Sequence, residues 1–433
     1  MPSNPSFATR SVYLDHQAAT PLLPEVFEAM RPFFTDAYGS ASSLHQHGLR
    51  ARDALAQARE RIAAFIQAES PEEIIFTSDG TESANLAVKG TAWASQNRGR
   101  HVVASAIEHP AVLSSVQFLE QQGFKSTRLT VNSEGLIDPK VLRAALTDQT
   151  ILVAVHHANH DLGTIQPVKD LAAVTVDRGT PLFVDAEASA GWLPIDVRAM
   201  GADLLSFSPH RFQGPKGVGV LYRHRRARLS SLLHGGVQEE GRRAGTENIP
   251  AIVGAGVAAE IAGRELTKRV EHVAWLQQRL WEGLQTRVPY LKLNGPAPGP
   301  QRLAAQLNLS VEFVEGEGLL LMLDTRGIAV ASGTSCVSKA LKVSHVLTAI
   351  ELPHSLGQAA ILISLGPENT REEIDYVLET FPRIVAKLRA MSPMWDEFER
   401  GAVDSLIAPR AGKILLSSPP SPRGAGRGGQ GEG

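Results

Sequence analysis

Short runs of β-branched and aliphatic residues alternate with amphipathic stretches along the chain from about residue 70. The strand-like runs are EEIIFTS, HVVASAIEH, TILVAVHHAN, PLFVDAE, LLSFSPH and VGVLYRH. The stretches between them, such as TESANLAVKGTAWASQ and PAVLSSVQFLEQQG, have the apolar spacing of helices. This alternation is typical of parallel strands joined by crossover helices, so we expect an α/β sheet with helices on both faces.

The pattern changes near residue 265, where a long charged helix, RELTKRVEHVAWLQQRLWEGLQTRV, leads to a short β-rich stretch and further helices. We therefore expect an N-terminal segment over 1–20, a large α/β domain over 21–265, a smaller α+β domain over 266–395 and a tail over 396–433. The tail ends in SSPPSPRGAGRGGQGEG, which is rich in Pro, Gly and Ser, so disorder is predicted from about residue 417.

Charge and cysteine content exclude several classes of protein. The chain has 43 Lys and Arg residues against 45 Asp and Glu residues, so no global field recruits nucleic acid or an anionic membrane. No apolar run approaches the ~18 residues of a transmembrane helix, and the N-terminus lacks a signal-peptide core, so we expect a cytoplasmic protein. Cys336 is the single cysteine, which excludes an intramolecular disulfide. It could ligate a cluster only together with a partner chain.

Polar residues follow several predicted strands at their carboxyl ends, where open α/β sheets bind ligands. FTSDGTES places Gly80 and Thr81 at a helix N-terminus, where they could hold a phosphate or simply cap the helix. SAIEHP leaves His109 either as a hydrogen-bonded turn residue or as a ring stacked on a planar ligand. LFVDAE ends in Asp185, whose carboxylate is costly to bury without a cation or a protonated ring nitrogen.

The stretch SFSPHRFQGPKG, residues 206–217, predicts an anion site, because a strand leads into Ser208, His210, Arg211 and a glycine-rich turn. Arginine binds phosphate well, but its guanidinium stays protonated and is a poor nucleophile toward a carbonyl. The segment therefore predicts anion binding without the chemistry of a lysine.

Two other motifs favour different conclusions. HHANHD contains His156, His157 and His160, but strand alternation puts His157 on the opposite face from the other two, so no metal site is predicted. VASGTSCVSKA places Cys336 in a small Gly/Ser loop near two lysines, Lys339 and Lys342. We expect an accessible thiol there, whose thiolate could act as a nucleophile.

Taken together, these residues resemble the cysteine desulfurases of the nitrogen-fixation and iron–sulfur-cluster type, within the class V aminotransferase group of pyridoxal-phosphate enzymes. The likeness runs from YLDHQAATPLLPEV to SLGPENTREEIDYVLE and includes RRAGTENIPAIVG. It implies the aspartate-aminotransferase-like fold type I, with a large mixed or parallel sheet domain and a smaller α+β domain, in a homodimer. It also implies conversion of L-cysteine to alanine, with the sulfur held as a protein persulfide for iron–sulfur cluster or thio-cofactor biosynthesis.

The resemblance also implies a role for each matched residue. It assigns Thr81, Ser208 and His210, beside Gly80, to the phosphate of pyridoxal 5′-phosphate, and His109 to the face of the pyridine ring as a catalytic residue.

Other roles follow from the same resemblance. Asp185 would pair with the ring nitrogen, and Asn159 would lie near the ring hydroxyl. Thr246 would reach the phosphate of the neighbouring subunit, and Cys336 would carry the persulfide to a sulfur-acceptor or iron–sulfur scaffold protein.

The sequence departs from the family at functional positions. Arg211 stands where the family has the Schiff-base lysine, and the nearby Lys216 matches a separate loop lysine of the family. Leu362, in ILISLG, replaces the arginine that binds the substrate carboxylate, and Ala188 replaces a glutamine that contacts the ring hydroxyl. Smaller departures are Ser40 and Ala41 in GSASS and Glu240 in GGVQEEG.

Three functions remain open at this point. The first is a working or impaired cysteine desulfurase. The second is a catalytically silent partner or scaffold in sulfur transfer or iron–sulfur assembly, because a persulfide cysteine needs no lysine to accept sulfur. In a sharper form, the chain completes the active site of an intact paralogue in a heterodimer, since the cross-subunit residue Thr246 is retained. The third is a lysine-free pyridoxal enzyme with His210 or His160 as base.

Overall fold

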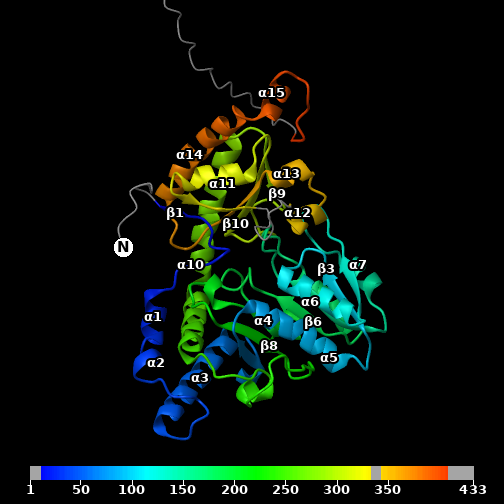
Figure 1. The fold of residues 1–433 in the computed structure, drawn as a ribbon, viewed down its shortest axis with the longest axis vertical. Coiled ribbons are helices and arrows are strands. Elements are labelled where there is room, and N and C mark those ends of the chain that lie inside the picture. The colour runs from blue at the N-terminus through cyan, green and yellow to red at the C-terminus, as the bar shows by residue number, and fades with distance from the viewer. Residues whose placement is uncertain (1–10, 333–342, 408–433) are drawn as a thin grey trace, which may run out of the picture.

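The computed structural model describes residues 11–332 and 343–407. Its main feature is a seven-stranded sheet with the order β2-β8-β7-β6-β5-β3-β4 (Figure 1). The strands are β2 (Ile74–Thr77), β3 (His101–Ser105), β4 (Lys125–Leu129), β5 (Thr150–His156), β6 (Leu182–Asp185), β7 (Leu204–Phe207) and β8 (Gly219–Arg223). Neighbouring strands are parallel except at β8, which runs antiparallel to both β2 and β7. The expected α/β fold with a large mixed sheet is confirmed.

All six predicted strands form, and β4 is an additional one. Its sequence, KSTRL, contains one apolar residue and is mostly half-buried, because β4 lies at the sheet edge and pairs with β3 alone. An edge strand can be this polar, so hydrophobic runs do not reveal it.

Helices cover both faces of this sheet. Alternate side chains of each strand enter different cores: Val103 and Val153 belong to one hydrophobic cluster, and Val102 and Leu152 to another. The covering helices are α3 (Gln46–Phe65), the continuous helical segment α4–η2–α5 (Gly80–Asn85, Leu86–Gly90, Thr91–Ser95), α6 (Pro110–Gln121), α7 (Pro139–Ala145), α8 (Val168–Val176) and α9 (Val197–Met200). Both faces are therefore apolar, as expected of strands joined by crossover helices.

A second, four-stranded antiparallel sheet has its own core. Its order is β12-β13-β10-β9, formed by Ala331–Ser332, Ala360–Ser364, Gln306–Val311 and Leu291–Asn294. The helices around it are α11 (Gly316–Asp324), α12 (His345–Ala349), α13 (His354–Gln358), α14 (Arg371–Arg389) and α15 (Pro393–Glu399). The strand β1 (Val12–Tyr13) pairs in parallel with β11 (Ile328–Ala329), so the N-terminal segment adds to this smaller part.

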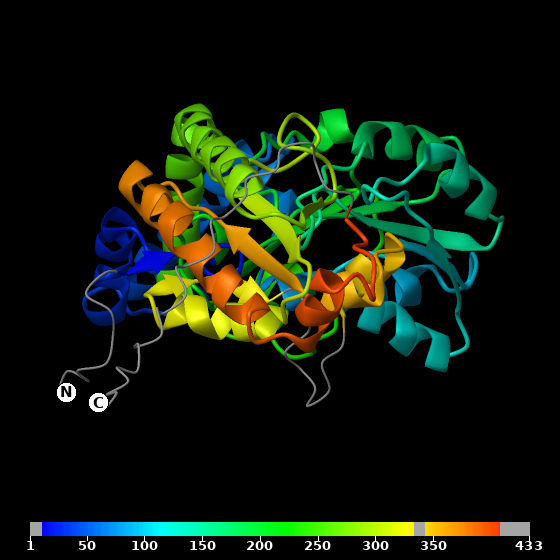
Figure 2. The same ribbon diagram turned by 90° about the horizontal axis from the view of Figure 1, so that it is seen from above.

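Helix α10 (Ile249–Arg287) joins the two parts as one rod of 39 residues, and Figures 1 and 2 show it running from the large sheet into the smaller part. It packs along α3, where a Cβ on Gly256 would lie only 2.9 Å from the Cα of Ala58. The expected division at 265/266 falls inside this helix. Helices α1 (Pro24–Met30) and α2 (Pro32–Thr35) lie beside its first turns. Within the described ranges, no helix is long and apolar enough to cross a membrane.

Candidate functional site

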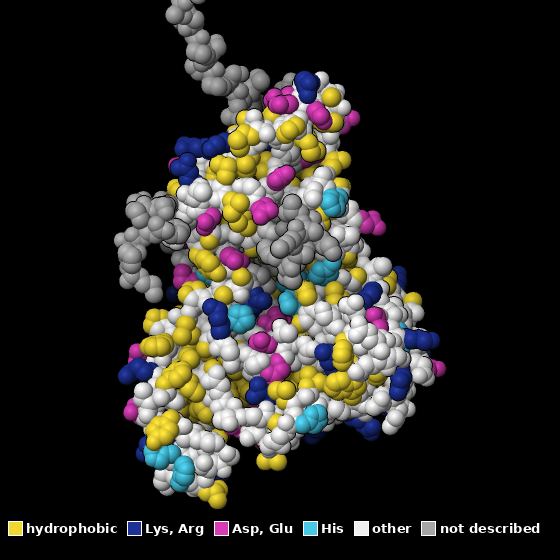
Figure 3. Space-filling view, in the orientation of Figure 1, with side chains coloured by type: hydrophobic (Ala, Val, Ile, Leu, Met, Phe, Trp, Pro, Cys, Tyr) yellow, Lys and Arg dark blue, Asp and Glu magenta, His cyan; other side chains and the backbone are white. Residues whose placement is uncertain are grey.

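The carboxyl ends of β2, β3, β5, β6 and β7 meet at one edge of the large sheet and bring the predicted site residues together. Asp185 is the last residue of β6, His109 follows β3, and Ser208 follows β7. Helix α4 begins at Gly80, just after β2. In the space-filling view, acidic and histidine side chains gather across the middle of one face, between the two parts of the chain (Figure 3).

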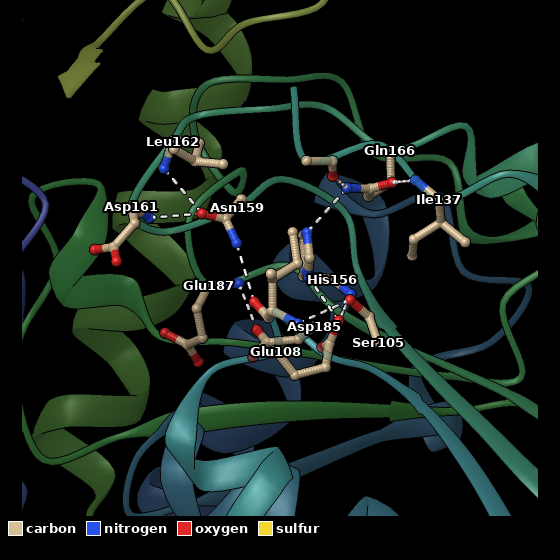
Figure 4. A network of polar contacts seen from close by, with 12 residues as sticks. Ser105, Glu108, Ile137, His156, Asn159, Asp161, Leu162, Gln166, Asp185 and Glu187 are labelled. Carbon is tan, nitrogen blue, oxygen red and sulfur yellow. Dashed lines mark hydrogen bonds and ion pairs between the residues drawn. The ribbon is translucent and has the colours of Figure 1, made fainter. Parts of the chain in front are cut away.

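A buried acid–histidine pair lies at the base of this region, beside Asp185 (Figure 4). The Oε1 atom of Glu108 lies 2.6 Å from His156 Nδ1 and also accepts the backbone N–H of His156 at 2.9 Å. Burial raises the pKa of Glu108, and the neighbouring His156 partly offsets this rise. Sequence reasoning missed Glu108, although its position beside His109 at a strand end was a usable signal.

The histidines of HHANHD have separate partners. His156 contacts Glu108, whereas His157 lies 3.0 Å from Ser189 Oγ through its Nδ1 atom. Burial lowers the pKa of His157 to about 4. Among the described residues, no group of three His, Cys, Asp or Glu side chains is placed to hold a metal ion.

His109 occupies the turn between β3 and α6. Its Nδ1 atom accepts the backbone N–H of Ala111 at 3.2 Å, and its ring meets His160 edge-on with the centroids 5.2 Å apart. Burial lowers the pKa of His109, while Asp185 raises it in part. The local contacts are those of a turn histidine, and stacking on a ligand ring stays a prediction.

Asn159 is fully buried and braces the loop after β5. Its side-chain amide donates to the carbonyl of Ile107 at 3.0 Å, and its Oδ1 atom accepts the backbone N–H groups of Asp161 and Leu162 (Figure 4). These bonds hold Asn159 close to the predicted ring site, whereas its contact with a ring hydroxyl stays a prediction.

The predicted anion site contains an acidic residue that sequence reasoning did not select. The backbone N–H of Gly80 donates to Ser208 Oγ at 2.7 Å, and Ser208 Oγ donates to Glu187 Oε1 at 3.0 Å. The other carboxyl oxygen of Glu187 lies 3.9 Å from Arg211 Nε. Glu187 follows Asp185 by two residues, and its backbone N–H donates to Asp185 Oδ1 at 2.9 Å.

The environment of Glu187 favours its neutral form. Burial and the neighbouring Asp185 raise its pKa to about 8, while Arg211 and the Ser208 hydrogen bond act in the opposite direction. The same region holds His210 neutral: burial lowers its pKa to about 4, and Arg211 lowers it further. His210 therefore adds no positive charge to the anion site at neutral pH.

Arg211 ends the short turn η3 (Pro209–Arg211), which the N-terminal segment braces. Thr20 Oγ1 donates to the carbonyl oxygen of His210 at 2.8 Å. The Arg211 side chain is only 18% exposed. Lys216, five residues further on, is exposed in the following turn.

Thr246 is exposed and lines a pocket of about 200 Å³ together with Ser78, Gly217, Arg243 and Asn248, beside the N-terminus of helix α4. Arg243 forms a two-bond ion pair with Glu82 of helix α4.

The other departures from the family pattern are placed as follows. Leu362 is buried in β13, opposite Ala331 of β12, and Ala188 is buried in the core of the smaller part. Ala41 packs in a small apolar cluster, and the Oγ atoms of Ser40 and Ser42 are 2.8 Å apart.

Glu240 has a left-handed backbone with φ 56° and pairs with Arg242 on the surface. Cys336, Lys339 and Lys342 lie outside the described residues.

A family model described as aminotransferase class-V matches residues 12–377. The matched range includes every strand of both sheets, so the fold and its strand-end site define a class V aminotransferase, a family of pyridoxal-phosphate-dependent proteins.

Among the individual proteins similar in sequence are cysteine desulfurases, one branch of this class. The cysteine desulfurase IscS of Clostridium botulinum (strain Hall) is 44% identical over 389 residues, which cover 90% of this chain and 98% of the relative. The cysteine desulfurase IscS of Methanosarcina thermophila is 44% identical over 391 residues, covering 90% of this chain and 96% of the relative.

Solved structures agree with these relatives. A NifS-like protein superimposes with a TM-score of 0.82 at 35% identity, covering 88% of this chain and 100% of that chain. SspA in complex with cysteine has a TM-score of 0.72 at 35% identity, covering 83% and 100%. The chain therefore belongs to the cysteine desulfurases of the class V aminotransferase family.

The residues present can be tested against pyridoxal phosphate, the cofactor of this family. The ring end fits, because Asp185 supplies a buried carboxylate that a protonated ring nitrogen could pair with, and His109 lies near it. The phosphate end does not fit as the side chains lie. There the Ser208 hydroxyl is bonded to Glu187, and Arg211 faces the other oxygen of the same carboxyl group.

Proposed function

We propose that this chain is a catalytically silent cysteine desulfurase relative that acts as a partner in sulfur transfer. The observation that carries the proposal is Arg211, which is only 18% exposed and faces Glu187, at the position that the family resemblance gives to the Schiff-base lysine. A guanidinium stays protonated at physiological pH, so Arg211 can neither form the covalent link to the cofactor nor move protons at the reacting carbon.

Substrate orientation is weakened as well. Leu362 supplies a buried hydrocarbon side chain where the family has an arginine for the substrate carboxylate. Positioning and covalent attachment are two of the largest contributions to enzymatic rates. Losing both favours a role that does not need carbon–sulfur cleavage.

Sulfur transfer needs only the cysteine. The thiolate of Cys336 would attack the outer sulfur of a persulfide on a donor protein. A sulfur–sulfur bond forms to Cys336 while the donor sulfur–sulfur bond breaks, and the donor leaves as a thiolate, so no net oxidation occurs. We place this exchange in the cytoplasm, where thiols stay reduced. An acceptor or iron–sulfur scaffold protein would then receive the sulfur.

The donor in this proposal is an intact, lysine-containing desulfurase that pairs with this chain. Thr246 is exposed and lines a pocket beside the N-terminus of helix α4, which suits a residue that serves a neighbouring subunit. L-cysteine would then be the substrate of the partner and not of this chain. A homodimer is the competing state.

The test measures alanine and labelled sulfur separately. The purified chain, incubated with pyridoxal phosphate and L-cysteine, is expected to release no alanine above a protein-free control. After addition of a lysine-containing cysteine desulfurase and cysteine carrying radiolabelled sulfur, the wild-type chain is expected to acquire label, and Cys336→Ser is not.

Either half of the test can refute the proposal. Alanine release by the chain alone would make it an active desulfurase. Equal labelling of wild type and Cys336→Ser would remove the sulfur-carrier role. Co-expression with an intact paralogue that yields only homodimers would refute the heterodimer.

A further inference from the structure

We propose that Glu187, held by Ser208 and facing Arg211, is an internal replacement for a bound phosphate and closes the anion site to phosphorylated ligands. This inference deepens the proposed function, on which it rests for the silence of the site. The inference concerns which ligands the site can bind. The loss of the lysine alone does not say whether a phosphorylated ligand can still bind there.

The first support is the close approach of Glu187 to helix α4. A Cβ added to Gly80 would collide with the Glu187 carboxyl group, which therefore lies directly over the first residue of the helix. A bound anion approaches the same end of a helix, because the first N–H groups have no partner within the helix. The helical segment behind it is continuous from residue 80 to 95.

The second support is the use of hydrogen-bond donors. Ser208 has one hydroxyl hydrogen, and it is given to Glu187 Oε1 while the oxygen accepts from Gly80. Two groups that the family resemblance assigns to the phosphate are thus bonded to each other, and one of them, Ser208, is also bonded to Glu187. The neighbouring backbone N–H groups of Ser78 and Glu82 donate to Glu82 Oε2 and Asp79 Oδ1.

The third support is the local charge. Asp79 and Asp185 both raise the pKa of Glu187, so a phosphate dianion entering here would meet the same two carboxylates. Arg211 is the cation that faces them, and His210 is held neutral by burial. Like charges disfavour the ionised form of a group. The site is therefore electrostatically suited to a protonated carboxyl group and not to a dianion.

The experiment compares ligands that differ only in their phosphate. Pyridoxamine 5′-phosphate and pyridoxamine both lack the aldehyde, so neither forms covalent links with surface lysines. Isothermal titration calorimetry at pH 7 measures the binding of each to wild type, Glu187→Ala and Glu60→Ala. Glu60 is an exposed residue of α3 and controls for the loss of one acidic side chain.

We expect Glu187→Ala to bind pyridoxamine 5′-phosphate at least tenfold more tightly than wild type, with pyridoxamine affinity changed by less than threefold. Glu60→Ala should match wild type for both ligands. Wild-type binding of the phosphorylated ligand as tight as that of Glu187→Ala would overturn the inference. That outcome, with no alanine formed from cysteine, would leave the proposed function standing. Alanine formation would refute the proposed function whatever the affinities.

Discussion

Replacing Glu187 with glutamine should change how the stability of the protein depends on pH. The folded protein raises the pKa of this carboxyl group from 4.5 to about 8. The folded state therefore binds the proton more tightly than the unfolded chain does. As pH rises through this interval the unfolded chain ionises first, so the free energy of unfolding falls. Below pH 4.5 Glu187 is protonated in both states and does not lower the free energy of unfolding. Above pH 8 the free energy of unfolding is lowered by the full cost of ionising Glu187 in the folded protein.

The magnitude follows from the two pKa values. At about 1.4 kcal/mol for each tenfold change in proton binding, the wild-type protein should lose about 3 to 4 kcal/mol between pH 5 and pH 8 through this residue. The charged groups that face Glu187 are Asp185, Asp79 and Arg211, and all are unchanged in Glu187→Gln. The glutamine does not titrate, so the variant should not show this loss. The difference in the free energy of unfolding between Glu187→Gln and wild type should therefore shift by this amount in favour of the variant between pH 5 and pH 8.

Urea unfolding followed by circular dichroism at pH 5, 6, 7 and 8 measures the effect. The comparison uses wild type, Glu187→Gln and the exposed control Glu60→Gln, which should follow wild type at every pH. Parallel curves for wild type and Glu187→Gln across this range would mean that Glu187 is already ionised in the folded protein, and the reasoning about its environment would be wrong.

Three further changes test other contacts by urea unfolding. Gly80→Ala should cost about 1 to 3 kcal/mol in wild type but less than about 1 kcal/mol in Glu187→Ala, because the collision partner is then absent; equal costs in both backgrounds would contradict this contact. Gly256→Val should destabilise by about 1 to 3 kcal/mol, because α10 lies against the backbone of Ala58, and an unchanged midpoint would contradict the close packing. Arg302→Met should cost about 3 kcal/mol or more, because this buried guanidinium binds backbone carbonyls of both parts of the chain; a loss below about 1 kcal/mol would refute its bridging role.

The sequence predicts the large sheet well because its central strands are buried on both faces. Runs such as the one ending at Asp185 are continuously apolar, and few other structures accommodate them. The edge strand β4 was missed, since an edge carries no such requirement. A change in composition places the domain division at 265/266, whereas α10 continues through it because one helix can bury successive stretches of its length in two cores.

The site was predictable where a residue acts through its position at a strand end, and less so where two residues act together. Asp185, Ser208 and His109 are predicted because each lies at or just after the carboxyl end of a strand. Glu187 is not, because its function depends on where its side chain points after leaving the strand. Only the three-dimensional contacts with Gly80 and Ser208 make it part of the anion site.

Arg211 and Glu187 are best understood as one functional pair. The partly buried guanidinium of Arg211 brings a permanent charge, which is costly unless an opposite charge or a polar partner lies near it. Glu187 is such a partner at 3.9 Å, and it occupies the space from which a phosphate would otherwise balance the arginine. Restoring lysine alone would therefore leave the anion site closed. Covalent attachment of pyridoxal phosphate, fixed by borohydride reduction and located by peptide mass, is expected at residue 211 in Arg211→Lys/Glu187→Ala and not in Arg211→Lys. Equal attachment in the two variants would show that Glu187 does not limit cofactor attachment at residue 211, and that Arg211 and Glu187 act independently.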